Sequence, residues 1–96
     1  MHEPEVHRVF GELLLQESTP DIGGAQVSFV TAVEVARSQE AKGYELRAAT
    51  SLARLWREQG RHREARELLA PIYNWFTEGF DTKDLKDAKA LLRQLS

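Results

Sequence analysis

The residues best suited to bind an anion form an arginine-rich stretch in the middle of the chain. Six arginines fall within twenty residues: Arg47, Arg54, Arg57, Arg61, Arg63 and Arg66. A guanidinium holds phosphate or carboxylate through paired hydrogen bonds. The same stretch contains three glutamates: Glu58, Glu64 and Glu67. At helical spacing, pairs such as Arg54–Glu58 stabilise a helix by about 0.2–0.5 kcal/mol each. Both an anion-binding face and a solvated, ion-paired face fit this stretch, and the glutamates favour the second.

Metal chemistry has less support. His2 and His7 are five residues apart and His62 is remote, whereas a metal site needs several ligands with supporting hydrogen bonds. A second candidate is a set of aspartates at intervals of three, which could hold a cation: Asp81, Asp84 and Asp87. Helix capping and the helix dipole already explain acidic residues at the start of a helix. We therefore expect no metal site.

Catalytic chemistry has as little support. The chain has no Cys, no Ser stands beside a His, and most carboxylates neighbour basic residues, which favours their ordinary ionised state. Most of its aromatic residues at helical spacing are interpreted as core. Trp75 is the exception because it falls off the apolar stripe, so we expect it against the last helix or at an interface. We expect no catalytic or cofactor-binding residue and no enzymatic activity.

Length and charge narrow the class of protein. Ninety-six residues with 42% apolar residues make a single domain over 1–96 with one modest core. A net charge of −2 argues against a generic nucleic-acid binder, which is normally basic. No apolar run is long enough to span a bilayer, and the polar start MHEPEVHR is unlike a secretory signal. The absence of Cys fits the cytoplasm.

Apolar residues recur with the period of a helix throughout, and no segment alternates with a period of two. The pattern predicts an all-α protein of five helices: residues 5–16, 22–39 (starting at 22 or 25), 44–59, 62–78 and 83–95. Turn residues are assigned to the helix ends: Gly43, Gly60 and Gly79-Phe80 at C-termini, and Asp81 or Thr82 at the last N-terminus. Pro71 removes one backbone hydrogen bond inside the fourth helix and is expected to kink it.

The helical pattern occurs twice in the sequence. Three pairs of residues are separated by 40 positions: Ala25/Ala65, Phe29/Leu69 and Ala32/Ile72. A fixed offset of this size is typical of helical-repeat scaffolds, which bind other molecules.

The second copy resembles a tetratricopeptide repeat. It matches the large, small, aromatic, Gly, small and large positions of that motif with Leu52, Ala53, Trp56, Gly60, Ala65 and Leu69. It departs from the motif at Ile72, where a small residue is usual, and at Thr77, where Pro is usual. The first copy is looser, with a loop two residues longer: Phe10, Gly11, Leu14, Ala25, Phe29 and Ala32. The resemblance implies a tetratricopeptide-like α-α superhelix of two antiparallel pairs, at about 5–39 and 44–78, plus a capping helix at about 82–95.

The string APIYNWFTEGFDTKDL, residues 70–85, resembles the C-terminal end of bacterial multidomain regulators. In that family a nucleotide cyclase or DNA-binding domain precedes a STAND-type ATPase and a helical repeat array. The resemblance implies that the chain is the C-terminal sensor or assembly region of such a protein. The chain contains no GxxxxGK[ST] sequence, so no nucleotide hydrolysis is assigned to it.

We expect a non-catalytic scaffold in the cytoplasm that binds a protein, a peptide or preceding repeats. The resemblance implies that one face of helix 44–59 and the equivalent face of helix 5–16 line a concave groove. The groove residues are Arg8, Glu12, Arg47, Thr50, Arg54 and Arg57. The clamp that grips peptide C-termini in one subclass has Asn where Glu12 stands, so that clamp is not transferred. The alternative is a nucleotide- or nucleic-acid-binding module that uses the arginine face of helix 44–59.

The first helix is expected to expose apolar surface for self-association as a homodimer. The candidates are Val9, Leu13 and Leu15. Leu15 is the preferred candidate because it lies off the main apolar stripe.

Overall fold

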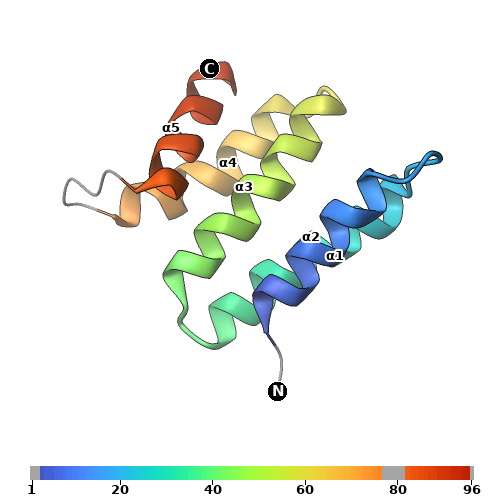
Figure 1. Cartoon of the computed structure of the whole chain (residues 1–96). Helices are drawn as coiled ribbons and strands as arrows, with labels where there is room; N and C mark the ends of the chain where they lie inside the picture. The colour runs from blue at the N-terminus through green and yellow to red at the C-terminus, as the bar shows by residue number, and fades with distance from the viewer. Residues whose placement is uncertain (1–2, 77–81, 96) are drawn as a thin grey trace.

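The computed structural model describes residues 3–76 and 82–95. These residues form five α-helices and no strand (Figure 1): α1 Pro4–Leu15, α2 Ile22–Ser38, α3 Lys42–Glu58, α4 His62–Trp75 and α5 Lys83–Leu95. The predicted all-α class is confirmed, and the predicted range of α5 agrees with the structure. Pro4 occupies the first turn of α1, where its missing N–H costs no helical hydrogen bond.

The turn between α2 and α3 differs from the prediction. Glu40, with φ 55°, ends α2 in the left-handed conformation that was assigned to Gly43. The Ala41 amide donates to the Ala36 carbonyl at 2.8 Å and the Glu40 amide to the Arg37 carbonyl at 3.1 Å, which is the Schellman pattern. Gly43 therefore lies inside the first turn of α3. The prediction was wrong because a glutamate rarely adopts this conformation.

The turn between α3 and α4 has the same hydrogen bonds. Gly60, with φ 77°, donates to the Arg57 carbonyl at 3.0 Å, and the Arg61 amide donates to the Trp56 carbonyl at 2.8 Å. Here the predicted glycine closes the helix, because glycine adopts positive φ without a steric penalty. The two turns that flank α3 thus share one geometry.

The ends of α4 and α5 were predicted in part. The helix α4 continues through Pro71 and ends at Trp75, because Phe76 is extended with φ −80° and ψ 99°. The predicted end at Glu78 was therefore too late. Thr82 caps α5 by accepting a hydrogen bond from the Leu85 amide at 3.3 Å. The predicted Gly79-Phe80 cap and Asp81 lie outside the described residues.

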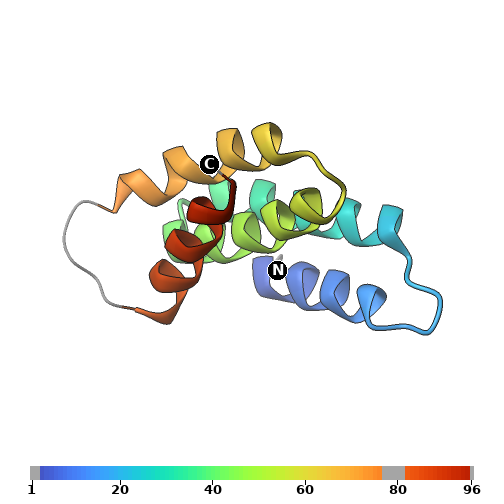
Figure 2. The same cartoon turned by 90° about the horizontal axis from the view of Figure 1, so that it is seen from above.

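Consecutive helices run antiparallel and pack against each other (Figures 1 and 2). The helix α3 also packs against α1 on one side and α5 on the other, whereas no Cα atom of α2 lies within 8 Å of a Cα atom of α4. Figure 2 shows α1, α3 and α5 along one side of the molecule and α2 and α4 along the other. The central helix α3 is consequently the most enclosed.

Small residues let the helices approach closely. A Cβ atom added at Gly11 would lie 2.7 Å from Cε1 of Phe29, and Phe29 is fully buried. The helices α1 and α2 therefore meet at the Gly11 backbone. Ala53 of α3 and Ala65 of α4 are also fully buried and belong to the same apolar cluster.

The core consists of two adjoining clusters. The larger joins α2, α3, α4 and α5, and the smaller contains Ala25, Phe29, Leu52 and Leu55. A buried carboxylate ties α2 to α3, because Glu45, only 3% exposed, accepts from Arg37 at 2.8 Å and from Lys42 at 3.3 Å. Buried charge is tolerated when it is paired in this way.

Candidate functional site

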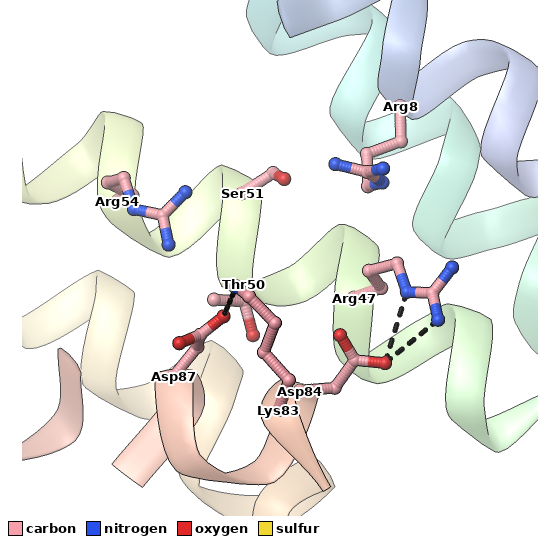
Figure 3. Close-up of a pocket in the computed structure, with 8 residues that line it drawn as sticks. All are labelled: Arg8, Arg47, Thr50, Ser51, Arg54, Lys83, Asp84 and Asp87. Atoms are coloured by element: carbon pink, nitrogen blue, oxygen red, sulfur yellow. Dashed lines mark hydrogen bonds and ion pairs between the residues drawn. The ribbon is translucent and has the colours of Figure 1, made fainter. Parts of the chain in front are cut away.

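A polar hollow of about 280 Å³ lies between α1, α3 and α5 (Figure 3). It is lined by Arg8 of α1 and by four residues of α3: Arg47, Thr50, Ser51 and Arg54. Three residues of α5 complete the lining: Lys83, Asp84 and Asp87. On α3 the lining residues recur at intervals of three and four, which places them on one face of the helix. The α1 and α5 helices flank that face, and this is why Thr50 and Ser51 are buried although they are polar.

Four of the six predicted groove residues meet at this hollow: Arg8, Arg47, Thr50 and Arg54. Glu12 and Arg57 do not line it. Arg57 lies further along α3, where it donates to Gln94 of α5 and to Glu58, the latter at 3.0 Å. The charge of Glu12 acts on Arg8 and raises its pKa, after the larger effect of the Glu5 hydrogen bond.

A charged network joins the three helices around the hollow. Arg47 donates to Asp84 through Nε at 3.1 Å and Nη2 at 2.9 Å, and to Glu5 through Nη1 at 3.1 Å. Glu5 also accepts from Nε and Nη2 of Arg8, at 2.9 and 3.1 Å. Partial burial raises the pKa of Glu5, but the hydrogen bonds from Arg8 and Arg47 outweigh it, so the pKa lies below its ordinary value. Glu5 therefore stays ionised between two guanidinium groups.

The aspartates of α5 are engaged by cations of the protein. Asp84 accepts from Arg47, and Asp87 accepts from Lys83 at 2.8 Å. The Lys83 hydrogen bond lowers the pKa of Asp87, with a further contribution from the charge of Arg54. No group of three acidic or histidine side chains placed to hold a metal ion occurs within residues 3–76 and 82–95.

Two donors at the hollow remain unused. Arg54 is exposed, and Asp87 acts on it only through space. Ser51 is 5% exposed, and no described residue accepts or donates a hydrogen bond at its hydroxyl. Thr50 differs, because its hydroxyl donates to the Leu46 carbonyl at 2.8 Å.

The α5 side of the hollow was not predicted from the sequence. Lys83, Asp84 and Asp87 line it only because α5 folds back on α3. The regular spacing of the aspartates was apparent in the sequence, and Asp87 pairs with Lys83 four residues away on the same helix. The pairing of Asp84 with Arg47, in contrast, depends on tertiary packing. The face of α3, in contrast, follows from helical periodicity alone.

The remaining arginines of the cluster favour the ion-paired interpretation. Arg61 donates to Glu64 and lies over the Trp56 ring at 4.7 Å from its centre. Arg63 pairs with Glu67 at 3.0 Å. Arg66 donates to the Leu95 carbonyl at 3.2 Å, so it helps to hold the end of α5 against α4.

The helix α1 exposes a continuous apolar face. Its large side chains are 44–62% exposed and border a shallow hollow of about 450 Å³: Val6, Val9, Phe10 and Leu13. Leu15, the preferred candidate for self-association, is partly buried and packs against the Ala25–Phe29–Leu52–Leu55 cluster. Val9 and Leu13 lie on the exposed face.

Trp75 borders a second apolar hollow, of about 280 Å³, together with Leu46, Phe76 and Leu85. Its ring meets Phe76 edge-on, with the ring centres 5.1 Å apart, and Lys42 lies 5.5 Å from the ring centre. Trp75 is 56% exposed. Its place beside the start of α5 agrees with one of the two positions expected for it.

No protein-family model, curated protein or solved structure matches this chain. The likeness to tetratricopeptide repeats and to the ends of bacterial regulators therefore stays a prediction from the residues. None of the described helices combines the length and apolar character required to cross a membrane.

Proposed function

We propose that this chain is a non-catalytic scaffold of tetratricopeptide-like helical pairs that assembles with another helical unit through α1. The observation that carries the proposal is the exposed apolar face of α1. In solenoid proteins each helical pair buries its apolar face against the next pair, and only capped ends meet solvent.

The second pair of helices indicates what that face is for. Aligning Gly11 with Ala53 places each residue of α1 opposite the residue 42 positions later in α3. The four exposed apolar residues of α1 then correspond to positions of α3 that are at most 5% exposed: Ala48, Ser51, Leu52 and Leu55. Leu52 and Leu55 are covered by Ala25 and Phe29 of α2. By the same packing, Phe10 and Leu13 are suited to contact a helix of a further unit.

The opposite end of the molecule has a different surface. The exposed residues of α5 are polar apart from Ala90, and all but Gln94 of these polar residues are basic: Lys83, Lys86, Lys89 and Arg93. Its inner residues Leu85, Ala88 and Leu91 are buried. A polar outer helix is the usual form of a capping element. This contrast supports α5 as a cap and α1 as the assembly surface.

The packing order supports the tetratricopeptide-like arrangement. The first helix of each pair contacts its own partner and also the first helix of the next pair, as α1, α3 and α5 do here. The resemblance of residues 70–85 to bacterial regulators adds the biological setting. In that setting the chain is a cytoplasmic sensor or assembly region of a larger signalling ATPase or cyclase.

Light scattering over a concentration series tests the proposal. The isolated chain is expected to self-associate through the exposed face of α1, and Phe10→Glu is expected to return it to a monomer. Val27→Glu is the matched control, because Val27 is an apolar residue of α2 that is 66% exposed, against 56% for Phe10. A wild-type chain that stays monomeric at high concentration contradicts the proposal, as does equal loss of association in both variants.

The alternative, a nucleotide- or nucleic-acid-binding module, is supported by Arg54, which makes no ion pair with a described residue, and opposed by the ion pairs of Arg47, Arg57, Arg61 and Arg63. It requires binding that weakens steeply with salt and is lost when Arg54→Glu and Arg57→Glu are combined.

A further inference from the structure

The hydroxyl of Ser51 is a polar group that lies at the hollow without a partner among the described residues. Ser51 is 5% exposed, yet its hydroxyl has no hydrogen-bond partner. Among the described residues, every buried side-chain nitrogen or oxygen atom that is sealed from solvent has a hydrogen-bond partner. Because the Ser51 oxygen has no partner, it must still be accessible to solvent, and that access is through the hollow that Ser51 lines. A buried polar group without a protein partner is commonly satisfied by water or a ligand.

Two guanidinium groups supply further donors beside it. Figure 3 shows the Ser51 side chain between Arg54 and Arg8, with its hydroxyl directed toward Arg8. Arg54 has no hydrogen-bond partner among the described residues. Arg8 uses Nε and Nη2 on Glu5, which leaves its Nη1 unused. Donors from α1 and α3 thus face one space.

The charges around this space are unequal. Four basic and two acidic side chains line the hollow. Lys83 is matched by Asp87, and Arg47 is shared between Asp84 and Glu5. Arg54 alone among the four basic residues makes no ion pair with a described residue, although Asp87 attracts it through space. An anion is therefore the ligand that the hollow favours.

We propose that this hollow binds the phosphate group of a phosphomonoester, with the Ser51 hydroxyl and the Arg8 and Arg54 guanidinium groups as donors. The oxygens of a tetrahedral phosphate point in several directions and can meet donors from different helices, whereas a planar carboxylate offers only two oxygens. A phosphomonoester also carries about −1.5 to −2 charges at pH 7, and arginine pairs with it strongly. This site is distinct from the α1 assembly surface and does not depend on it.

Within the protein, Asp87 competes with a bound phosphate for Arg54, because the charges of Asp87 and Arg54 attract each other. Binding therefore includes a turn of Arg54 away from Asp87 toward the ligand. Asp87 keeps its hydrogen bond with Lys83 when this happens. Asp87→Asn is consequently expected to strengthen phosphate binding.

Titration of the ¹⁵N-labelled chain with inorganic phosphate, O-phosphoserine or acetate, at constant ionic strength and pH 7.5, tests the site. We expect amide shifts at residues 50–54 with both phosphates, and much smaller shifts with acetate. Tighter binding of O-phosphoserine than of inorganic phosphate would assign the ligand to an organic phosphomonoester. Equal binding of the two would assign it to free phosphate.

Ser51→Ala and Arg54→Gln are each expected to weaken binding about tenfold or more, because each removes a hydrogen bond to a charged group. Ser51→Ala is expected to fold normally, since its hydroxyl has no partner to lose. Arg63→Gln is the matched control, because Arg63 pairs with Glu67 on α4 away from the hollow. No saturable shifts, acetate binding as tight as phosphate, or equal affinity in all variants would overturn the proposal.

Discussion

Arg47 and Asp84 are 37 residues apart in the chain, yet Nε and Nη2 of Arg47 donate to the same Asp84 oxygen at 3.1 and 2.9 Å. The contact joins the second turn of α3 to the first turn of α5. Because Arg47 also donates to Glu5, one guanidinium connects three helices along the side of the molecule that carries the hollow. The arginine predicted as a ligand contact is therefore primarily a structural link.

Loss of this link is expected to loosen α5. We predict that Asp84→Asn lowers the free energy of unfolding by about 0.5–1 kcal/mol, a modest value because both side chains are partly exposed. Urea unfolding followed by circular dichroism measures this. Asp87→Asn removes an ion pair within α5 and only a through-space attraction to Arg54 of α3, so it is expected to cost less. Equal effects of the two changes would contradict a bridging role for Asp84.

The Glu5 network predicts acid sensitivity. The pKa of Glu5 in the folded chain lies below its ordinary value of 4.5, so ionised Glu5 contributes stability above that value. The contribution is lost as pH falls through the folded pKa. Glu5→Gln should therefore be less stable than wild type at pH 7, and the difference should shrink in strong acid. A difference that is independent of pH between 7 and 2.5 would rule out this linkage.

The contact of α1 with α2 is predicted to depend on Gly11. Gly11→Ala places a methyl group 2.7 Å from the buried ring of Phe29, and overpacking of this kind costs about 1–3 kcal/mol. Gly43→Ala is the control, because an added Cβ at this helical position meets no atom within 4 Å and should stabilise by about 0.5–1 kcal/mol. Thermal unfolding of the two variants should shift in opposite directions.

The two Schellman turns give a paired prediction. Glu40 has φ 55° and Gly60 has φ 77° at equivalent positions. Glu40→Gly should raise the free energy of unfolding, and Gly60→Ala should lower it, by about 1 kcal/mol each. If Glu40→Gly were destabilising in chemical unfolding, its side chain would have a stabilising role that outweighs the backbone strain.

Helical periodicity was sufficient to predict features within one helix. The set Arg47, Thr50 and Arg54 follows from spacing on α3, and the structure places all three at one hollow. Features set by contacts between helices were missed. Leu15 lies off the stripe of α1 but packs against the core cluster, and Arg57 lies too far along α3 to reach the hollow. The turn at Glu40 was missed because a residue other than glycine bears the positive φ.

The most direct test of assembly through α1 is a dilution series of the ¹⁵N-labelled chain by NMR. Concentration-dependent amide shifts are expected at residues 6–13, with residues 86–93 of α5 unchanged. The expected pattern disappears in Phe10→Glu and persists in Val27→Glu. Spectra that do not change with concentration, or shifts that gather on α5 instead of α1, would contradict the assignment of α1 as the assembly surface.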